Sequence, residues 1–270
     1  MRALPLVLVN TPEIELWPAR LCRARASTDA RRIAGGDIVL RRKRDGRYLA
    51  VVGRRGLVPL SPSLARETGL EAAIAALEVF DAPVPACSPL GRGTLPGDEV
   101  HDANAALGLP ADYAGTSGLS FHEEPRLLAF AGRDRYARAL WLLAPAARAW
   151  GAMRRAALGD GVVLEAISGF RGHAYQRGIL ERKRARGLSL EDILRVNAAP
   201  GHSEHHSGRA LDIGTPGEPP AEEGFERTPA FAWLQRHAPG FGFRLSYPRD
   251  NPHGITYEPW HWCWHAAPPG

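Results

Sequence analysis

Two patterns of apolar positions in the N-terminal third of the chain predict a small α/β module. Short apolar runs at residues 38–40 and 48–52 flank the turn sequence Asp45-Gly46, which is typical of a β-hairpin. An earlier apolar run at residues 4–9 predicts another strand. Residues 63–80 instead repeat apolar side chains every three or four positions, which predicts a helix.

A second folded region is predicted after a stretch rich in Pro, Gly and Ala at residues 81–122, where residues 101–107 suggest a short helix. We therefore place an N-terminal module with its linker at 1–122 and a second domain at 123–270. The predicted strands of that domain are 127–130, 140–143, 162–167, 209–213, 243–247 and 255–261. Its predicted helices are 145–158, 173–186, 190–196 and 230–237. The expected class is α+β, a small antiparallel sheet with flanking helices beside a smaller N-terminal α/β module.

Composition narrows the range of partners and compartments. The 270 residues include 44% hydrophobic side chains, which is typical of a globular protein. The net charge of +5 comes almost wholly from arginine, but no dense basic block carries interleaved aromatics, so nucleic-acid binding is not expected. Three widely spaced cysteines do not form a disulfide framework, which favours a reducing compartment.

Apolar runs in the chain are too short to cross a membrane. None approaches the ~20 residues of a transmembrane helix, and the run at 4–9 is short for the core of a signal peptide. We expect a cytoplasmic protein in preference to a periplasmic one, with no transmembrane segment.

Candidate chemistry concentrates in two polar segments, residues 203–212 and 258–261. Among their side chains are the imidazoles of His205 and His261 and the carboxylates of Asp212 and Glu258. Three such side chains can hold one zinc ion and leave a position for water, whose pKa zinc lowers to ~7. One carboxylate is left over to act as a base.

Local sequence favours the convergence of these side chains. Gly208 allows the backbone to turn back after His205. Alternation along a strand would place Asp212 on one face and Leu211 on the other. Pro259 argues against a helix, so we expect residues 255–261 to form a strand with a local irregularity that aims Glu258 and His261 at one point.

These segments resemble the D-alanyl-D-alanine metallopeptidases, which include VanY-type carboxypeptidases, VanX-type dipeptidases and phage endopeptidases. The first reads Ser-x-His-x-x-Gly-x-Ala-x-Asp from Ser203, and the second reads Glu-x-Trp-His from Glu258. Upstream, residues 168–176 resemble the family's Ser-Gly-Tyr-Arg-Ser segment, and residues 240–248 resemble the stretch before Glu-x-Trp-His. The resemblance covers about residues 125–265 and implies a Hedgehog/D-Ala-D-Ala peptidase-like fold.

The resemblance implies a role for each matching residue. One Zn²⁺ would be held by His205, Asp212 and His261, and Glu258 would be the general base and acid. Arg171 would stabilise the oxyanion or grip the terminal carboxylate of the substrate. The residues implied in substrate binding are Arg171, Gln176, Ser203 and Trp260.

Other candidate ligands are not expected to bind the metal. His206 adjoins a ligand but should point to the other side of an extended chain, and a fourth ligand such as Cys263 would close the site. Four other histidines are expected around the site or in solvent: His173, His202, His253 and His265. Residues 262–265 depart from the family's aromatic–Arg–Tyr continuation, which puts the outer pocket in doubt.

The resemblance implies hydrolysis of D-alanine-containing peptides derived from peptidoglycan. A D-alanyl-D-alanine carboxypeptidase is the leading interpretation, and a dipeptidase or a peptidoglycan endopeptidase is the alternative. A different class is a non-catalytic module that keeps zinc and binds peptidoglycan or a partner. The sequence does not indicate an oligomeric state.

The order of elements in the N-terminal module also resembles the front half of a Nudix domain. Its Arg66-Glu67 pair would open the helix, but the acidic pairs that hold magnesium are replaced by Ala75-Ala76 and Val79-Phe80. Those side chains lack the oxygen ligands that a hard cation requires. The module is therefore expected to be a degenerate, non-catalytic Nudix-like remnant or an unrelated α/β unit, and a nucleoside-diphosphate hydrolase is disfavoured.

Overall fold

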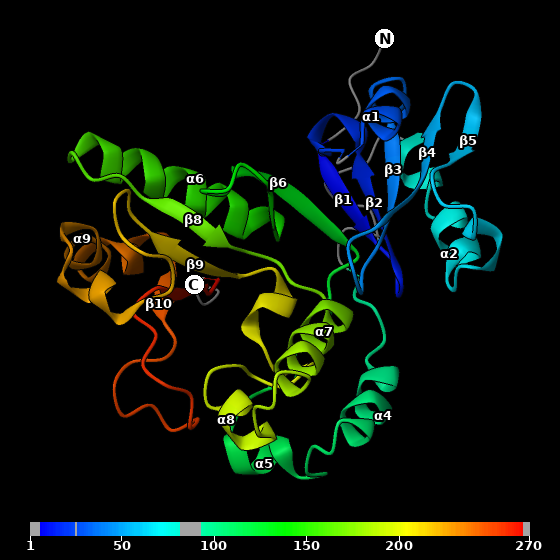
Figure 1. Cartoon of the computed structure of the whole chain (residues 1–270). Helices are drawn as coiled ribbons and strands as arrows, with labels where there is room; N and C mark the ends of the chain where they lie inside the picture. The colour runs from blue at the N-terminus through cyan, green and yellow to red at the C-terminus, as the bar shows by residue number, and fades with distance from the viewer. Residues whose placement is uncertain (1–5, 25, 82–92, 267–270) are drawn as a thin grey trace. The chain divides into compact units, whose positions relative to one another are not determined.

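The computed structural model describes the chain except for residues 1–5, 25, 82–92 and 267–270 (Figure 1). The chain forms two compact units. Unit 1 contains residues 1–95 and 124–130, and unit 2 contains residues 96–123 and 131–270. None of the helices in the described part combines the length and apolarity that a bilayer crossing requires. The α+β class predicted from the sequence is confirmed.

Unit 1 is built on antiparallel strands in the order β5-β4-β3-β2-β1-β6. Their bounds are Val7–Asn10 (β1), Ile14–Pro18 (β2), Ile38–Arg42 (β3), Tyr48–Gly53 (β4), Gly56–Pro59 (β5) and Leu127–Arg133 (β6), of which residues 131–133 count to unit 2. The predicted hairpin at 38–40 and 48–52 is confirmed as β3 and β4, and Gly46 in its turn has φ +71°. The strand predicted at 4–9 is found as β1, although its first two residues lie outside the described part.

The single helix predicted at residues 63–80 is wrong. The structure has a 3-10 turn at Leu64–Arg66 (η2), then helices Leu70–Ala75 (α2) and Glu78–Asp81 (α3). Gly69, at φ +79°, interrupts the helical backbone between η2 and α2. Glu67 leaves the helical path to accept two hydrogen bonds from Arg42 at 2.9 Å. Unit 1 also contains the helix Ser27–Ala34 (α1).

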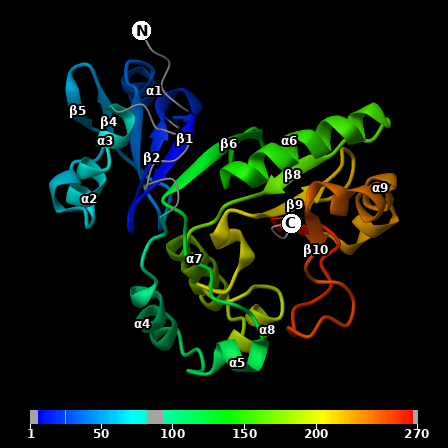
Figure 2. The ribbon, with the colours of Figure 1, turned by 180° about the vertical axis from the view of Figure 1, so that it is seen from behind.

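Unit 2 is built on a four-stranded antiparallel sheet in the order β10-β11-β9-β8. The bounds are Glu165–Ser168 (β8), Ala210–Gly214 (β9), Phe243–Leu245 (β10) and His261–Trp264 (β11), and the strand Ala139–Leu142 (β7) precedes them in the chain. The helix Ala144–Gly159 (α6) lies along β8 in both Figure 1 and Figure 2. Its buried Trp150 and Met153 pack with Leu211 and Trp262 of the sheet, and this close packing supports the strands from one face.

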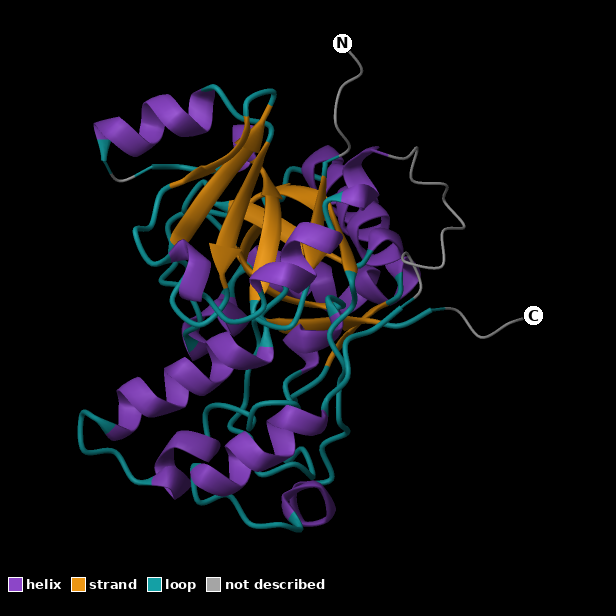
Figure 3. Ribbon diagram, turned by 90° about the vertical axis from the view of Figure 1, so that its right-hand side faces the viewer, coloured by secondary structure: helices purple, strands orange, loops and turns teal. Residues whose placement is uncertain are grey.

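The other helices of unit 2 are Asp98–Ala106 (α4), Tyr113–Ser117 (α5), His173–Arg184 (α7), Leu190–Leu194 (α8) and Pro229–His237 (α9). Figure 3 shows them in purple beside the orange strands. Leu107 and Leu109, just after α4, share a buried cluster with Leu180 of α7 and Ile193 of α8. Ser189 caps α8, since its Oγ accepts from Asp192 N at 3.0 Å.

The strand predicted at residues 255–261 is wrong in its bounds. Extended pairing begins at His261, and the residues before it form a loop and turn. Glu258 N donates to Tyr247 O at 3.0 Å, and Glu258 O accepts from His261 N at 3.1 Å. Pro259 lies between these bonds and has no N–H for a ladder, so the sheet resumes only after it.

Candidate metal and catalytic site

Three side chains from distant parts of unit 2 converge on one point. The ligand atoms of His205, Asp212 and His261 all lie within 4.8 Å of one another, and all three residues are buried. The sheet accounts for two of them, because Asp212 of β9 pairs directly with His261 of β11 in the antiparallel register. The structure therefore brings together the three residues that the sequence resemblance implies as metal ligands.

His205 approaches from a 3-10 turn, Glu204–Ser207 (η4), that precedes β9. Gly208 ends this turn at φ +67°, a left-handed conformation that favours glycine, and the chain then enters β9. His205 Nδ1 donates to Gly169 O at 2.8 Å. That bond leaves Nε2 pointing at Asp212 Oδ2, 3.3 Å away.

His261 lies on the other side of Asp212. Its Nδ1 is 3.2 Å from Asp212 Oδ1, and its Nε2 is 2.9 Å from Glu204 Oε2. The rings of His205 and His261 stand nearly perpendicular, with centroids 4.9 Å apart. The predicted alternation along β9 is confirmed, because Asp212 lines the cleft whereas Leu211 and Ile213 belong to the hydrophobic core.

The buried charges of the cluster are strongly coupled. Burial opposes ionisation of Asp212, but His205 and His261 hold its pKa well below the usual value. Burial lowers the pKa of His205. Burial alone would also lower the pKa of His261, but hydrogen bonds with Asp212 and Glu204 raise it to about 10. An anionic carboxylate between two imidazoles is a strong attractor for a cation.

This donor set fits zinc. Two imidazole nitrogens and one carboxylate oxygen are preferred Zn²⁺ ligands, and three protein ligands are the pattern of catalytic sites. Each imidazole also has its second nitrogen bonded, His205 to a backbone carbonyl and His261 to a carboxylate. Such outer partners fix the ring orientation of metal-binding histidines.

Glu258 lies beside the cluster as a potential proton carrier. Its Oε2 is 3.7 Å from His261 Nδ1, and its side chain is 14% exposed. Burial raises its pKa to about 7, although the His261 charge opposes the shift. A carboxyl group that titrates near neutral pH can both take and return a proton.

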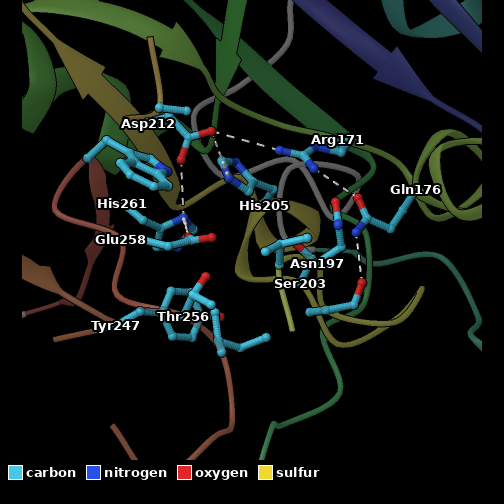
Figure 4. Close-up of a pocket in the computed structure, with 15 residues that line it drawn as sticks. Arg171, Gln176, Asn197, Ser203, His205, Asp212, Tyr247, Thr256, Glu258 and His261 are labelled. Carbon is cyan, nitrogen blue, oxygen red and sulfur yellow. Dashed lines mark hydrogen bonds and ion pairs between the residues drawn. The ribbon is translucent and has the colours of Figure 1, made fainter. Parts of the chain in front are cut away.

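Arg171 lies across from Glu258 and is held by several bonds (Figure 4). Its backbone N donates to His205 O at 3.2 Å. Its Nη1 donates to Gln176 Oε1 at 3.0 Å, and its Nη2 lies 3.8 Å from Asp212 Oδ2. Gln176 in turn donates to Ala198 O at 2.7 Å and is 1% exposed. In the structure Gln176 orients Arg171 as well as lining the cleft.

The cleft next to the cluster has a volume of about 320 Å³. All residues that the sequence resemblance implies in catalysis, metal binding or substrate binding line it. Four further polar residues at the cleft and the cluster were not assigned from the sequence: Glu204, Tyr247, Asn197 and Thr256. The only signal for Glu204 was its place beside His205, and Asn197 and Thr256 lie in stretches without a motif.

The other histidines lie outside the three-residue cluster. His206 is fully buried, and its Nδ1 donates to the backbone oxygen of Arg171. His173 and His202 are also buried. His265 is exposed, and Cys263 is buried with its sulfur outside the metal cluster.

Comparison with known proteins identifies the same region. Residues 140–267 match the family model described as VanY: D-alanyl-D-alanine carboxypeptidase. The chain is 36% identical over 128 residues to the putative carboxypeptidase YodJ of Bacillus subtilis, covering 43% of each chain. These matches confirm, for this part of the chain, the resemblance to the D-alanyl-D-alanine metallopeptidases.

Two further similarities were found. A D-alanyl-D-alanine carboxypeptidase of Enterococcus faecium is 43% identical over 63 residues, which are 23% of this chain and 19% of that protein. A solved vancomycin-resistance D,D-pentapeptidase VanY in complex with Zn(II) is 25% identical, with a TM-score of 0.39, and the match covers 49% of this chain and 76% of that one. The chain thus spans less than half the length of the two curated relatives named here.

Proposed function

We propose that the chain is a zinc-dependent peptidase that hydrolyses D-alanine-containing cell-wall peptides, with D-alanyl-D-alanine carboxypeptidase as its main activity. The observation that carries the proposal is the buried convergence of His205, Asp212 and His261 beside Glu258, at one end of a cleft. The match of residues 140–267 to the VanY family model supports the choice of substrate.

His205, Asp212 and His261 would hold a single zinc ion. When bound, zinc supplies a Lewis acid that polarises the scissile carbonyl and lowers the pKa of water. The neutral imidazole of His205 is favoured by burial, which lowers its pKa, and an unprotonated imidazole is the form that binds a metal.

Glu258 is the general base and then the general acid. Its carboxylate accepts a proton from the attacking water and delivers it to the nitrogen of the departing D-alanine. A pKa near 7 suits both transfers, because neither protonation state is strongly disfavoured at neutral pH. Its backbone bonds to Tyr247 and His261 fix the side chain at the edge of the cluster.

Arg171 supplies the positive charge of the cleft. A guanidinium can bind the oxyanion that develops on the scissile carbonyl, or the terminal carboxylate of a D-Ala-D-Ala end. Gln176 accepts a hydrogen bond from Arg171 Nη1, and His205 O accepts one from the Arg171 backbone N. The guanidinium is therefore positioned before the substrate arrives. Such preorganisation avoids reorganisation during the reaction.

The experiment that tests this function measures zinc and D-alanine release together. The purified protein is assayed for zinc by mass spectrometry, and D-alanine release is followed with D-Ala-D-Ala and with a stem pentapeptide ending in D-Ala-D-Ala. We expect one zinc per chain, turnover of the pentapeptide, loss of turnover after chelation and recovery on adding Zn²⁺.

Other results would redirect the proposal. Turnover of the dipeptide alone would identify a dipeptidase, and cleavage confined to cross-linked peptides would identify an endopeptidase. A protein that holds zinc yet turns over none of these peptides would be a binding module, and the proposed catalytic function would be wrong.

A further inference from the structure

Glu204 contacts one of the three proposed metal ligands, and none of the catalytic roles described above uses this contact. It lies between Ser203 and His205, on the turn that carries the first ligand, yet its side chain contacts the last ligand, His261. Glu204 Oε2 is 2.9 Å from His261 Nε2, and the Glu204 side chain is 19% exposed. We propose that Glu204 is a positioning residue that fixes the tautomer and orientation of His261, so that His261 binds the metal through Nδ1.

The hydrogen bonds around His261 define which nitrogen faces the metal. A carboxylate only accepts, so Nε2 must carry the proton that it shares with Glu204. Nδ1 lies 3.2 Å from Asp212 Oδ1 and donates to that carboxylate when no metal is bound, so a metal would take the place of the Nδ1 proton while Glu204 keeps the proton on Nε2. Any metal held between His205 and Asp212 would meet this nitrogen.

His205 has the opposite arrangement. Its Nδ1 donates to Gly169 O at 2.8 Å, and its Nε2 faces Asp212 Oδ2 at 3.3 Å. The two histidines would therefore bind one ion through different ring nitrogens, Nε2 from His205 and Nδ1 from His261. The nearly perpendicular rings, 85° apart, agree with two approaches to one point.

Ser246 holds the Glu204 carboxylate in place. Ser246 Oγ donates to Glu204 Oε2 at 2.6 Å, the same oxygen that accepts from His261. The Glu204 side chain thus connects the turn η4 to Ser246, in the loop after β10, and to His261 of β11. Because the partner of His261 is charged, it also increases the basicity of the imidazole, which a backbone carbonyl does more weakly.

This inference rests on the proposed zinc site, and zinc affinity tests it without an activity assay. Glu204→Gln keeps an acceptor but removes the charge, and Glu204→Ala removes both. Glu222→Gln, at an exposed glutamate of the same unit, is the matched control. Zinc dissociation constants are measured by chelator competition, with far-UV circular dichroism of the metal-free proteins as the check on folding.

We expect the dissociation constant to rise about 10- to 100-fold in Glu204→Ala, the range typical of lost outer partners, and by less in Glu204→Gln. Ser246→Ala should weaken zinc binding less than Glu204→Ala, and Glu222→Gln should match the wild type. If Glu204→Ala does not fold, Glu204→Gln and Ser246→Ala decide the result. Unchanged zinc affinity in the folded variants would overturn the inference.

A second readout separates positioning from a merely structural role. Long-range ¹H–¹⁵N spectra of the zinc-loaded wild type report which nitrogen of each histidine carries a proton. We expect the proton of His261 on Nε2 and that of His205 on Nδ1, and a protonated Nδ1 on His261 would refute the inference. A wild type that binds no zinc would instead contradict the proposed function, so the two failures are distinguishable.

Discussion

Asp212 Oδ1 lies 3.2 Å from His261 Nδ1, although 49 positions separate the two residues in the sequence. The antiparallel pairing of β9 with β11 places them directly opposite each other. Because strand side chains alternate between faces, a slip of one residue would move either ligand to the other face of the sheet. The metal cluster therefore depends on the register of this sheet and on the core beneath it.

Replacing Asp212 should remove the metal and leave the fold. Asp212→Asn keeps the size of the side chain but loses the charge between the two imidazoles. We expect zinc affinity to fall by more than about 100-fold, beyond the range of an outer partner, because a direct ligand is lost. Chelator competition measures it, with Asp192→Asn on the exposed face of α8 as the control. Retention of wild-type affinity would show that Asp212 is not a ligand.

Replacing Glu258 should separate metal binding from turnover. Glu258→Gln keeps the shape of the side chain but cannot accept a proton, so kcat for D-alanine release should fall about 10²- to 10⁴-fold. The zinc content should stay at the wild-type value, because the cluster keeps its three ligands. Elemental analysis and a coupled D-alanine assay measure the two quantities, with Glu222→Gln for comparison. Turnover at the wild-type rate would exclude Glu258 as the base.

Arg171 should contribute through the geometry of its guanidinium. Arg171→Lys keeps one positive charge but loses the fork that binds two oxygens and the bond from Nη1 to Gln176. We expect kcat/KM for the pentapeptide to fall about 10²- to 10³-fold, as for loss of an oxyanion donor, with zinc retained. Arg186→Lys, at an exposed position after α7, should not change it. An equal fall of kcat/KM in Arg171→Lys and Arg186→Lys would contradict a specific role of the Arg171 guanidinium.

The sequence was most informative where function restricts residue types. The segments around His205, Asp212 and His261 indicated a metal site because imidazoles and carboxylates at that spacing suit zinc. Predicted helices α6, α7 and α9 also match, and in α6 the apolar positions repeat with the helical period.

The errors arose where tertiary contacts override local pattern. The helix predicted at 63–80 is interrupted because Glu67 pairs with Arg42, 25 positions away. The strand before His261 is displaced because Glu258 bonds to Tyr247 in a loop. The role we infer for Glu204 rests on its contact with His261, 57 positions away, which no local pattern reports.

The ion pair between Arg42 and Asp45, in the turn between β3 and β4, should add stability that depends on pH. Arg42 donates to Asp45 and holds the pKa of that carboxyl below its usual value. The bond therefore stabilises the folded state above the unfolded pKa of about 3.9, and this stabilisation is lost as the pH falls through the folded pKa. Asp45→Asn should lower the urea midpoint at pH 7, and the difference from the wild type should close at low pH. Glu71→Gln is the control, and a difference that persists at low pH would contradict this cause.

Gly208 should be required for the backbone that connects the metal ligands. It has φ +67° at the end of η4, is buried, and its carbonyl accepts from Leu143 N at 2.7 Å. A residue with a Cβ in this conformation costs about 1–2 kcal/mol, whereas asparagine adopts it more readily. We expect Gly208→Ala to lower the free energy of unfolding by this amount and to weaken zinc binding, because His205 lies three residues before. Gly208→Asn should lose less stability, measured by chemical denaturation, and less zinc affinity, measured by chelator competition. A Gly208→Ala variant as stable as the wild type would show that the turn tolerates another conformation.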